Sequence, residues 1–114
     1  MKVIRFDGAE PYEPPGHTGV VNRLLVGRGS GEVTEVSVWH GAIEPGGGAD
    51  PHVHAEAVQV YVVVSGVVTV SDEESTVDLG PGDAAIFAAG DRHEVVNAGE
   101  GTATLYVVSA PALR

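Results

Sequence analysis

The stretch that decides the fold is GGGADPHVHAEAVQVYVVVSG, residues 46–66. It begins with three glycines, reaches a His-x-His pair after Pro51, and ends in a Val-rich run closed by Gly66. The residue before a proline disfavours the helical region, so His52 and His54 should lie on an extended segment. Side chains alternate along a strand with a period of two, so both imidazoles should point to one face.

Two more side chains complete a candidate metal site. Gln59 opens the Val-rich run, and His93 follows a turn at Gly90. Neutral imidazole is the commonest metal ligand in proteins. Three imidazoles and an amide oxygen leave open positions on a five- or six-coordinate ion, as catalytic sites require. We predict that His52, His54, Gln59 and His93 bind one divalent transition metal, and Zn, Fe, Ni, Mn and Cu all suit this set.

Outward from this stretch, short apolar runs alternate with Gly, Pro, Asp and Ser, and no segment of useful length has a helical period. The runs predict strands over residues 20–26, 33–43, 58–64, 67–71, 76–79, 84–87, 93–97 and 102–109. The glycines at 46–48 are expected to end the second strand. With the His-x-His segment this makes about nine strands, which favours an all-β barrel or sandwich.

The composition sets the class of protein. At 114 residues the chain has room for one modest core, which 43% hydrophobic but only 5% aromatic residues make aliphatic. No cysteine is present, which removes thiolate ligands, disulfides and a catalytic Cys. The net charge of −10 disfavours nucleic acid as a partner. No apolar run approaches the ~18 residues of a membrane span, and no signal peptide is visible. We expect a cytoplasmic protein without a nucleic-acid or membrane partner.

The spacing of the candidate ligands closely resembles the two signature motifs of the cupin superfamily. The first stretch reads Gly46-x5-His52-x-His54-x4-Gln59-x6-Gly66, and the second reads Gly82-x5-Ala88-x-Gly90-x2-His93-x3-Asn97. The cupin motifs are G-x5-H-x-H-x3-4-E-x6-G and G-x5-P-x-G-x2-H-x3-N. Gln59 replaces the usual Glu and Ala88 the usual Pro, and every other fixed position matches. The motifs span residues 46–97, nearly half of the chain.

This resemblance implies an all-β, single-domain jelly-roll barrel with a metal in its mouth. We expect an N-terminal arm over residues 1–18, the cupin barrel over 19–110 and a short tail over 111–114. Cupins of this size usually pair through exposed sheet edges or exchanged N-terminal strands, so the resemblance also implies a homodimer.

The exchange of Glu for Gln59 has a chemical consequence. Three imidazoles and an amide leave the formal charge of a divalent ion uncancelled, which favours an anionic, chelating substrate and Lewis-acid work over redox cycling. Gln also occurs here in small cupins that convert unsaturated uronates to keto-sugars. Those proteins use an Asp and an Arg near the last strand, and residues 105–111 contain neither. The similar ligands therefore do not imply that this chain catalyses the same reaction.

The first functional hypothesis is a metal-dependent enzyme that activates a small-molecule substrate as a Lewis acid. Its substrate would be an organic acid, a sugar acid, a phenolic or a diketone, and its reaction that of an isomerase, cyclase or lyase. A metal-dependent dioxygenase is the alternative among enzymes. A ligand-binding or sensing cupin without turnover is the alternative from another class, because few acid or base residues lie near the ligands in the sequence.

Two residues are candidates for catalysis. His40, on the strand before the first motif, either faces the cavity as a general acid or base or is a half-buried strand histidine. Tyr61 shares the strand parity of Gln59, so either its hydroxyl lines the pocket or its ring packs in the core.

Five further side chains have predicted roles, and three of them have two alternatives each. His17 covers the barrel mouth or is exposed, and Glu56 approaches the metal or is solvated. Arg23 binds a substrate carboxylate or forms a surface ion pair. Glu94 should turn away from the site by strand alternation, and Asn97 should make structural hydrogen bonds.

Overall fold

The longest strand, β2 (Ser37–His52), connects the two sides of the barrel. In the computed structural model, which describes residues 1–113, its first part pairs antiparallel with β8 (Ala103–Ala110) as far as Ile43. Its last part pairs with β7 (His93–Val96), where His52 lies opposite His93. β2 therefore places His52, the first candidate ligand, opposite His93, the candidate ligand that begins β7.

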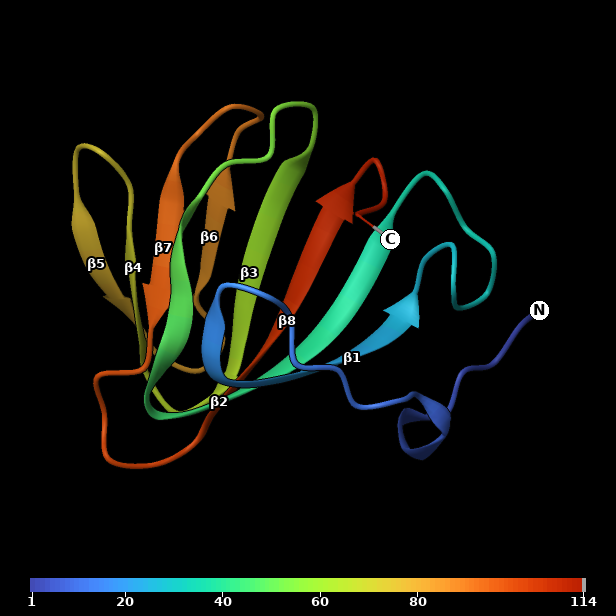
Figure 1. Ribbon diagram of the computed structural model, residues 1–114, viewed down its shortest axis with the longest axis horizontal. Helices are drawn as coiled ribbons and strands as arrows, with labels where there is room; N and C mark the ends of the chain where they lie inside the picture. Colours follow the sequence, from blue (N-terminus) through green and yellow to red (C-terminus); the bar gives the residue numbers. More distant parts are fainter. Residues whose placement is uncertain (114) are drawn as a thin grey trace.

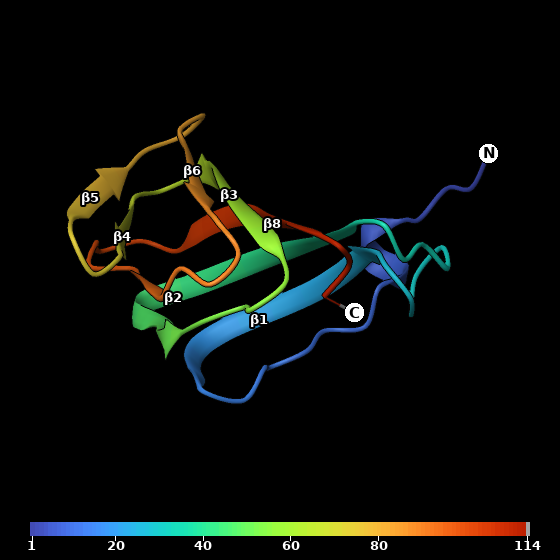
Figure 2. The same cartoon turned by 90° about the horizontal axis from the view of Figure 1, so that it is seen from above.

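The remaining strands close most of the barrel around β2. They are β1 (His17–Val26), β3 (Val58–Ser65), β4 (Val68–Ser71), β5 (Thr76–Leu79) and β6 (Ala84–Phe87). The order of hydrogen-bonded neighbours is β5-β4-β7-β2-β8-β3-β6, with β1 beside β2. Figures 1 and 2 show β4 and β5 at one end of the molecule and the N-terminal segment at the other. The prediction of an all-β jelly-roll barrel is confirmed.

Among residues 1–113 the helical structure is one 3-10 turn, Phe6–Gly8. Within that part of the chain no helix has the length and apolar character needed to cross a membrane.

The glycines before the His-x-His pair do not end β2, contrary to the sequence-based expectation. β2 runs through them and remains paired with β1 and β7 on its two sides. A Cβ at Gly47 would lie 2.6 Å from the carbonyl oxygen of Thr18, and a Cβ at Gly48 would collide with that of Val95. These glycines are required because two other backbones approach β2 closely, which is a known role of glycine inside a strand.

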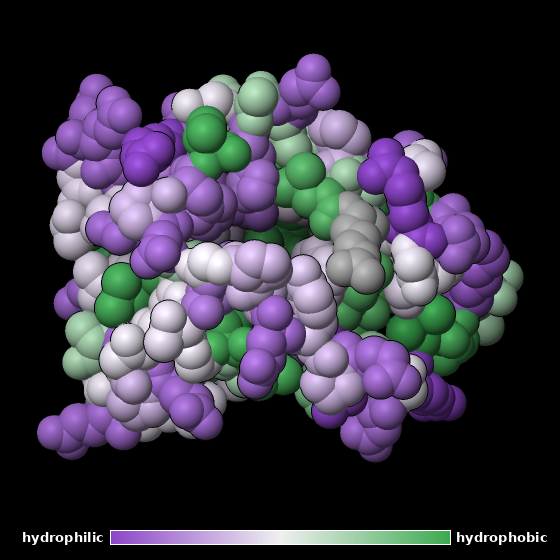
Figure 3. Space-filling view, in the orientation of Figure 1, coloured by the Kyte–Doolittle hydropathy of each residue, from purple (hydrophilic) through white to green (hydrophobic). Residues whose placement is uncertain are grey.

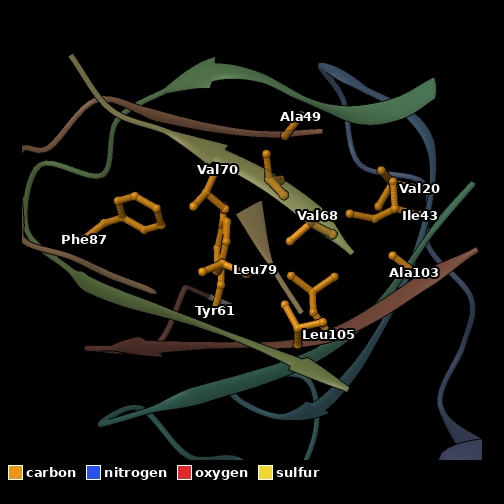
Figure 4. Packing of buried hydrophobic residues seen from close by; sticks show 12 residues of the cluster. Val20, Ile43, Ala49, Tyr61, Val68, Val70, Leu79, Phe87, Ala103 and Leu105 are labelled. Atoms are coloured by element: carbon orange, nitrogen blue, oxygen red, sulfur yellow. The ribbon is translucent and has the colours of Figure 1, made fainter. Parts of the chain in front are cut away.

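The core fills the space between the strands with mostly aliphatic side chains. Val63 and Val68 are almost fully buried, and Ile43 and Leu105 pack in the same cluster. Figure 4 shows these side chains directed inward from several strands, with the ring of Phe87 at one edge of the group. Burial of each such side chain is worth about 1.5–3 kcal/mol. This packing makes the barrel a rigid frame for its mouth.

The N-terminal segment lies against β1 and is held there by Arg23. The Arg23 guanidinium donates hydrogen bonds to the carbonyl oxygens of Phe6 (3.1 Å) and Ala9 (2.7 Å). It also lies 4.6 Å from the centre of the Phe6 ring. The guanidinium of Arg23 thus binds the backbone of this segment, and Arg23 does not line the main cavity of the described residues.

Candidate metal centre

A cavity of about 190 Å³ lies inside the barrel and reaches its mouth. Its lining combines polar side chains with a larger apolar wall, and the polar ones include His17, His52, His54, Gln59, Tyr61 and Ser109. Pockets that hold drug-sized ligands measure roughly 300–1,000 Å³, so this cavity suits a smaller molecule. In the orientation of Figure 1, hydrophobic side chains are visible in the middle of the face, within a largely hydrophilic periphery (Figure 3).

Three histidines converge beside this cavity. The ligand atoms of His52, His54 and His93 all lie within 4.8 Å of one another. Their ring centroids are 4.4 Å apart for His52 and His93, 5.0 Å for His52 and His54, and 5.8 Å for His54 and His93. The structure thus brings together the three imidazoles that the motif spacing selects.

Backbone carbonyls fix the tautomers of two of these rings. The Nδ1 atom of His52 lies 2.8 Å from the carbonyl oxygen of Asp50, and that of His93 lies 2.9 Å from the carbonyl oxygen of Asp91. A carbonyl oxygen only accepts, so Nδ1 carries the proton and donates it. Each Nε2 is left with its lone pair, the state in which metal-binding histidines are usually held.

The amide oxygen of Gln59 faces the Nε2 lone pair of His93. Its Oε1 lies 2.8 Å from Nε2 of His93, and its Nε2 donates a 3.2 Å hydrogen bond to Oγ of Ser109. Two acceptor atoms at this distance repel each other unless a proton or a cation attracts both. Burial lowers the pKa of His93, which disfavours the proton. The donor set therefore fits a metal cation bound by both atoms.

The surroundings of His54 and His93 favour their neutral, metal-binding forms. Burial, followed by the proximity of His52 and His93, lowers the pKa of His54. Burial raises the pKa of Tyr61, so its hydroxyl stays protonated. The Tyr61 ring lies edge-on to His93, with centroids 5.8 Å apart, and it lines the cavity. The structure shows Tyr61 as a core aromatic, and the residue also borders the pocket.

The turn before His93 is tied to the segment that carries His54. The backbone N–H of Gly90 donates to the carbonyl oxygen of His54 (2.9 Å). The backbone N–H of Ala88 donates to Oδ2 of Asp91 (2.9 Å). A proline, usual in cupins at the position of Ala88, has no N–H to donate. The departure at Ala88 thus adds a hydrogen bond to the turn that positions His93.

Of the two alternatives given for His40, the structure shows the half-buried strand histidine and not a residue facing the cavity. Trp39 and Gly41 line the cavity, and strand alternation turns His40 to the other face of β2. Its ring packs edge-on against Phe6 (centroids 4.9 Å apart) and Tyr106 (5.5 Å). Burial, followed by the charge of Arg23, lowers its pKa. The structure therefore does not bring His40 to the histidine cluster.

Of the remaining candidates, His17 borders the site, whereas Glu56 and Asn97 do not. His17 lines the cavity, whereas Glu56 is exposed and belongs neither to the lining nor to the histidine group. Asn97 is fully buried and makes the predicted structural hydrogen bonds, to the carbonyl oxygens of Ile43 and Gly101 and from the N–H of Gly99.

Sequence reasoning missed two contributors to the site. Ser109 orients the amide of Gln59, and only the pairing of β3 with β8 places these two residues opposite each other. Trp39 forms part of the cavity wall, and its indole N–H donates to the carbonyl oxygen of Leu113 (3.3 Å). Strand alternation predicts that Trp39 lines the cavity only when it is known which face of β2 points inward.

The fold and the site together give the class of protein. It is a small jelly-roll β-barrel in which three histidines and an amide, gathered at the mouth, form a candidate metal centre. The chain belongs to the cupin family, because the family model described as "Cupin domain" matches residues 39–109, well over half of its length.

Relatives cover nearly the whole chain. A protein of Mycobacterium tuberculosis named beta-D-galactosidase Rv1717 is 32% identical over 110 residues, which are 96% of this chain and 94% of that protein. The structure of a predicted oxalate decarboxylase from Thermotoga maritima matches with a TM-score of 0.85 at 19% identity, covering 96% of this chain and 99% of that one. A sugar phosphate isomerase of the cupin superfamily from Silicibacter pomeroyi matches with a TM-score of 0.80 at 26% identity, covering 96% and 75%.

Proposed function

We propose that this protein is a metal-dependent enzyme that converts a small oxygenated metabolite by Lewis-acid activation, as an isomerase, cyclase or lyase. The observation that carries the proposal is the convergence of three histidines with an amide oxygen placed 2.8 Å from His93. A bound divalent metal would supply polarisation of a carbonyl group and stabilisation of negative charge on oxygen.

The chain's own residues have separate tasks in this proposal. His52, His54, Gln59 and His93 would hold the ion, and because all four are neutral they would leave its charge available to the substrate. The protonated hydroxyl of Tyr61 is a hydrogen-bond donor beside the site. The apolar lining limits the access of water, which strengthens polar interactions within the cavity.

The wall of the cavity supports a substrate with a flat, apolar body. Trp39 and Tyr12 both line it, and their rings lie 5.8 Å apart with planes inclined by 33°. The hydrogen bond from the Trp39 indole to Leu113 holds this ring in place. Aromatic faces favour the stacking of planar groups. Phenolics and enolisable diketones fit these features better than highly hydroxylated acids.

The names of two relatives point to sugar substrates, which the experimental test should therefore include. The 26% identical relative named a sugar phosphate isomerase supports an isomerisation. The relative named a beta-D-galactosidase makes glycoside hydrolysis a second candidate function. Most glycoside hydrolases use a pair of carboxylates. Among residues 1–113 the cavity is lined by neither Asp nor Glu, so such an activity would depend on the histidine cluster.

The test combines metal analysis with turnover. Protein is purified without added metal, analysed for its metal content, and assayed with catechol, acetylacetone, keto-sugar acids and nitrophenyl β-galactoside. We expect about one divalent ion per chain, lost in His93→Ala and retained in the control His40→Ala, and turnover that follows the metal. Metal content well below one per chain, unrestored by added ions, would overturn the proposal. Full metal content without turnover on any substrate would favour a binding or sensing cupin.

We also propose that the protein forms a homodimer through the outer face of β6, β3 and β8. Ile86 is 74% exposed and Tyr106 is 38% exposed. The registers of β3 with β6 and β8 place Val60 and Val62 beside them. A surface patch of exposed apolar side chains supports an interface, because such patches are uncommon on monomers.

A further inference from the structure

We propose that His17 contacts the substrate and accepts a hydrogen bond from it on the open side of the metal centre. This inference rests on the proposed function, because it names His17 as a residue that contacts the substrate of that site. His17 lies outside both cupin motifs, in the first strand of the barrel.

The backbone holds His17 beside the ligand-bearing end of β2. His17 pairs with Ala49, and the N–H of Asp50 donates to the carbonyl oxygen of Gly16 (3.1 Å). Gly16 has a φ of +72°, which favours glycine and turns the chain sharply into β1. The ring of His17 is half-buried, lines the cavity, and has its centroid 6.1 Å from that of His52.

The ring of His17 is oriented in the same way as two of the candidate ligands. Its Nδ1 lies 3.0 Å from the carbonyl oxygen of Pro15, two residues earlier in the chain. His52 and His93 make the same bond to the residues two positions before them. The carbonyl can only accept, so Nδ1 of His17 carries the proton and Nε2 carries an acceptor lone pair.

The distances separate His17 from the metal ligands themselves. The group of ligand atoms within 4.8 Å of one another contains His52, His54 and His93, and His17 is outside it. His17 is thus close enough to the cluster to face a bound molecule but too far to complete the cluster. Because its free nitrogen is an acceptor, it selects a molecule with a hydroxyl or N–H donor, such as an enol, a phenol or a hydroxamic acid.

The experiment uses the full chain loaded with Co²⁺ and titrated with acetohydroxamic acid, followed by visible absorption. His17→Phe keeps a ring but removes the acceptor, and His17→Gln restores an acceptor. His40→Phe is the matched control, since His40 lies on the opposite face of the neighbouring strand. We expect a roughly tenfold weaker affinity for acetohydroxamic acid in His17→Phe, the upper range for one net hydrogen bond. His17→Gln should recover to within about threefold and His40→Phe should match the unaltered protein.

The affinity for Co²⁺, measured by competition with a chelator, and the thermal unfolding midpoint should be the same in all four proteins. Equal affinities of His17→Phe and the unaltered protein for acetohydroxamic acid would overturn the inference and leave the proposed function intact. A tenfold loss of Co²⁺ affinity with a changed spectrum in His17→Phe would also overturn it, because His17 would then be a ligand. Failure of the unaltered protein to bind Co²⁺ would overturn the proposed function itself, and this inference with it.

Discussion

The Nε2 atom of His93 lies 2.8 Å from the Oε1 atom of Gln59, and both side chains are buried. The amide nitrogen of Gln59 donates a hydrogen bond to Oγ of Ser109, while the amide oxygen faces the histidine. A neutral oxygen thus occupies the position where most cupins have a carboxylate. The charge of the candidate metal site depends on this one residue.

Gln59→Glu should tighten metal binding. A carboxylate beside a divalent cation adds an attraction that a neutral amide lacks, and about 1.4 kcal/mol of it amounts to tenfold in affinity. We expect the Kd for Zn²⁺, measured by competition with a chromophoric chelator, to fall by at least about tenfold. Ser109→Ala is the control that releases the amide without adding charge, and it should weaken binding slightly. Equal affinities of the Glu variant and the unaltered protein would show that this side chain is not a ligand.

Asp91→Ala should weaken the turn that presents His93. The variant removes the carboxylate that accepts the Ala88 N–H, while the backbone carbonyl that orients the His93 ring remains. We expect a loss of about 0.5–1.5 kcal/mol in the free energy of unfolding, from urea titration, because the hydrogen bond is exposed and water replaces the carboxylate as the partner of the N–H. Asp91→Asn keeps an acceptor oxygen and should lose less. A larger loss in the Asn variant would contradict this role.

Asn97→Ala should destabilise the barrel without removing a ligand. Asn97 is fully buried, and its amide makes three hydrogen bonds that join β2 to the loop after β7. The loss of several buried partners at once predicts about 2–4 kcal/mol of destabilisation in urea unfolding. The neighbouring change Glu94→Ala, at a partly exposed position, should cost less than about 0.5 kcal/mol. Similar unfolding curves for the two variants would be inconsistent with this assignment.

Much of the site could be predicted from the sequence because its parts lie at short, fixed spacings. The His-x-His spacing predicts that His52 and His54 face the same way, and both rings join the cluster although β2 ends at His52. Gln59 and His93 lie at the starts of two later strands. The features that require knowledge of strand pairing could not be predicted. Ser109 meets Gln59 only through the pairing of β3 and β8.

Two features of β2 could not be predicted, each for a physical reason. The register of β2 with β7 shifts between Ala49 and His52, so the inward parity at His52 does not extend back to His40, whose face the sequence left open. The glycines were interpreted as a turn, because a strand interior and a loop share the same residue type. Only the close approach of Thr18 and Val95 distinguishes the two.

The metal-free protein should lose stability as the pH falls below the ordinary histidine range. Burial lowers the pKa of His54 and His93 from the usual 6.5, so each binds its proton at lower pH in the folded state than in the unfolded state. Between those values the unfolded state holds more protons, and stability therefore decreases with falling pH. We expect the Tm in EDTA, followed by circular dichroism, to be flat above about pH 7 and to decline below about pH 6.5. A His93→Phe variant should decline less steeply, and a Tm that rises with acidification would contradict the burial of neutral histidines.

Ile86→Glu should separate the proposed homodimer into monomers. Ile86 is 74% exposed at the outer edge of the sheet and pairs with Val60, whose other neighbour is Val108. Stable interfaces bury ~800 Å² on each partner and tolerate few unpaired charges in their centre. Val21→Glu is the matched control, because Val21 is 38% exposed on β1, which pairs with β2 and belongs to none of the three strands of the proposed interface. Light scattering after size exclusion should give the dimer mass for the unaltered chain and for Val21→Glu, and the monomer mass for Ile86→Glu. A monomer mass for the unaltered chain would eliminate the dimer, and dissociation by Val21→Glu alone would move the interface to β1.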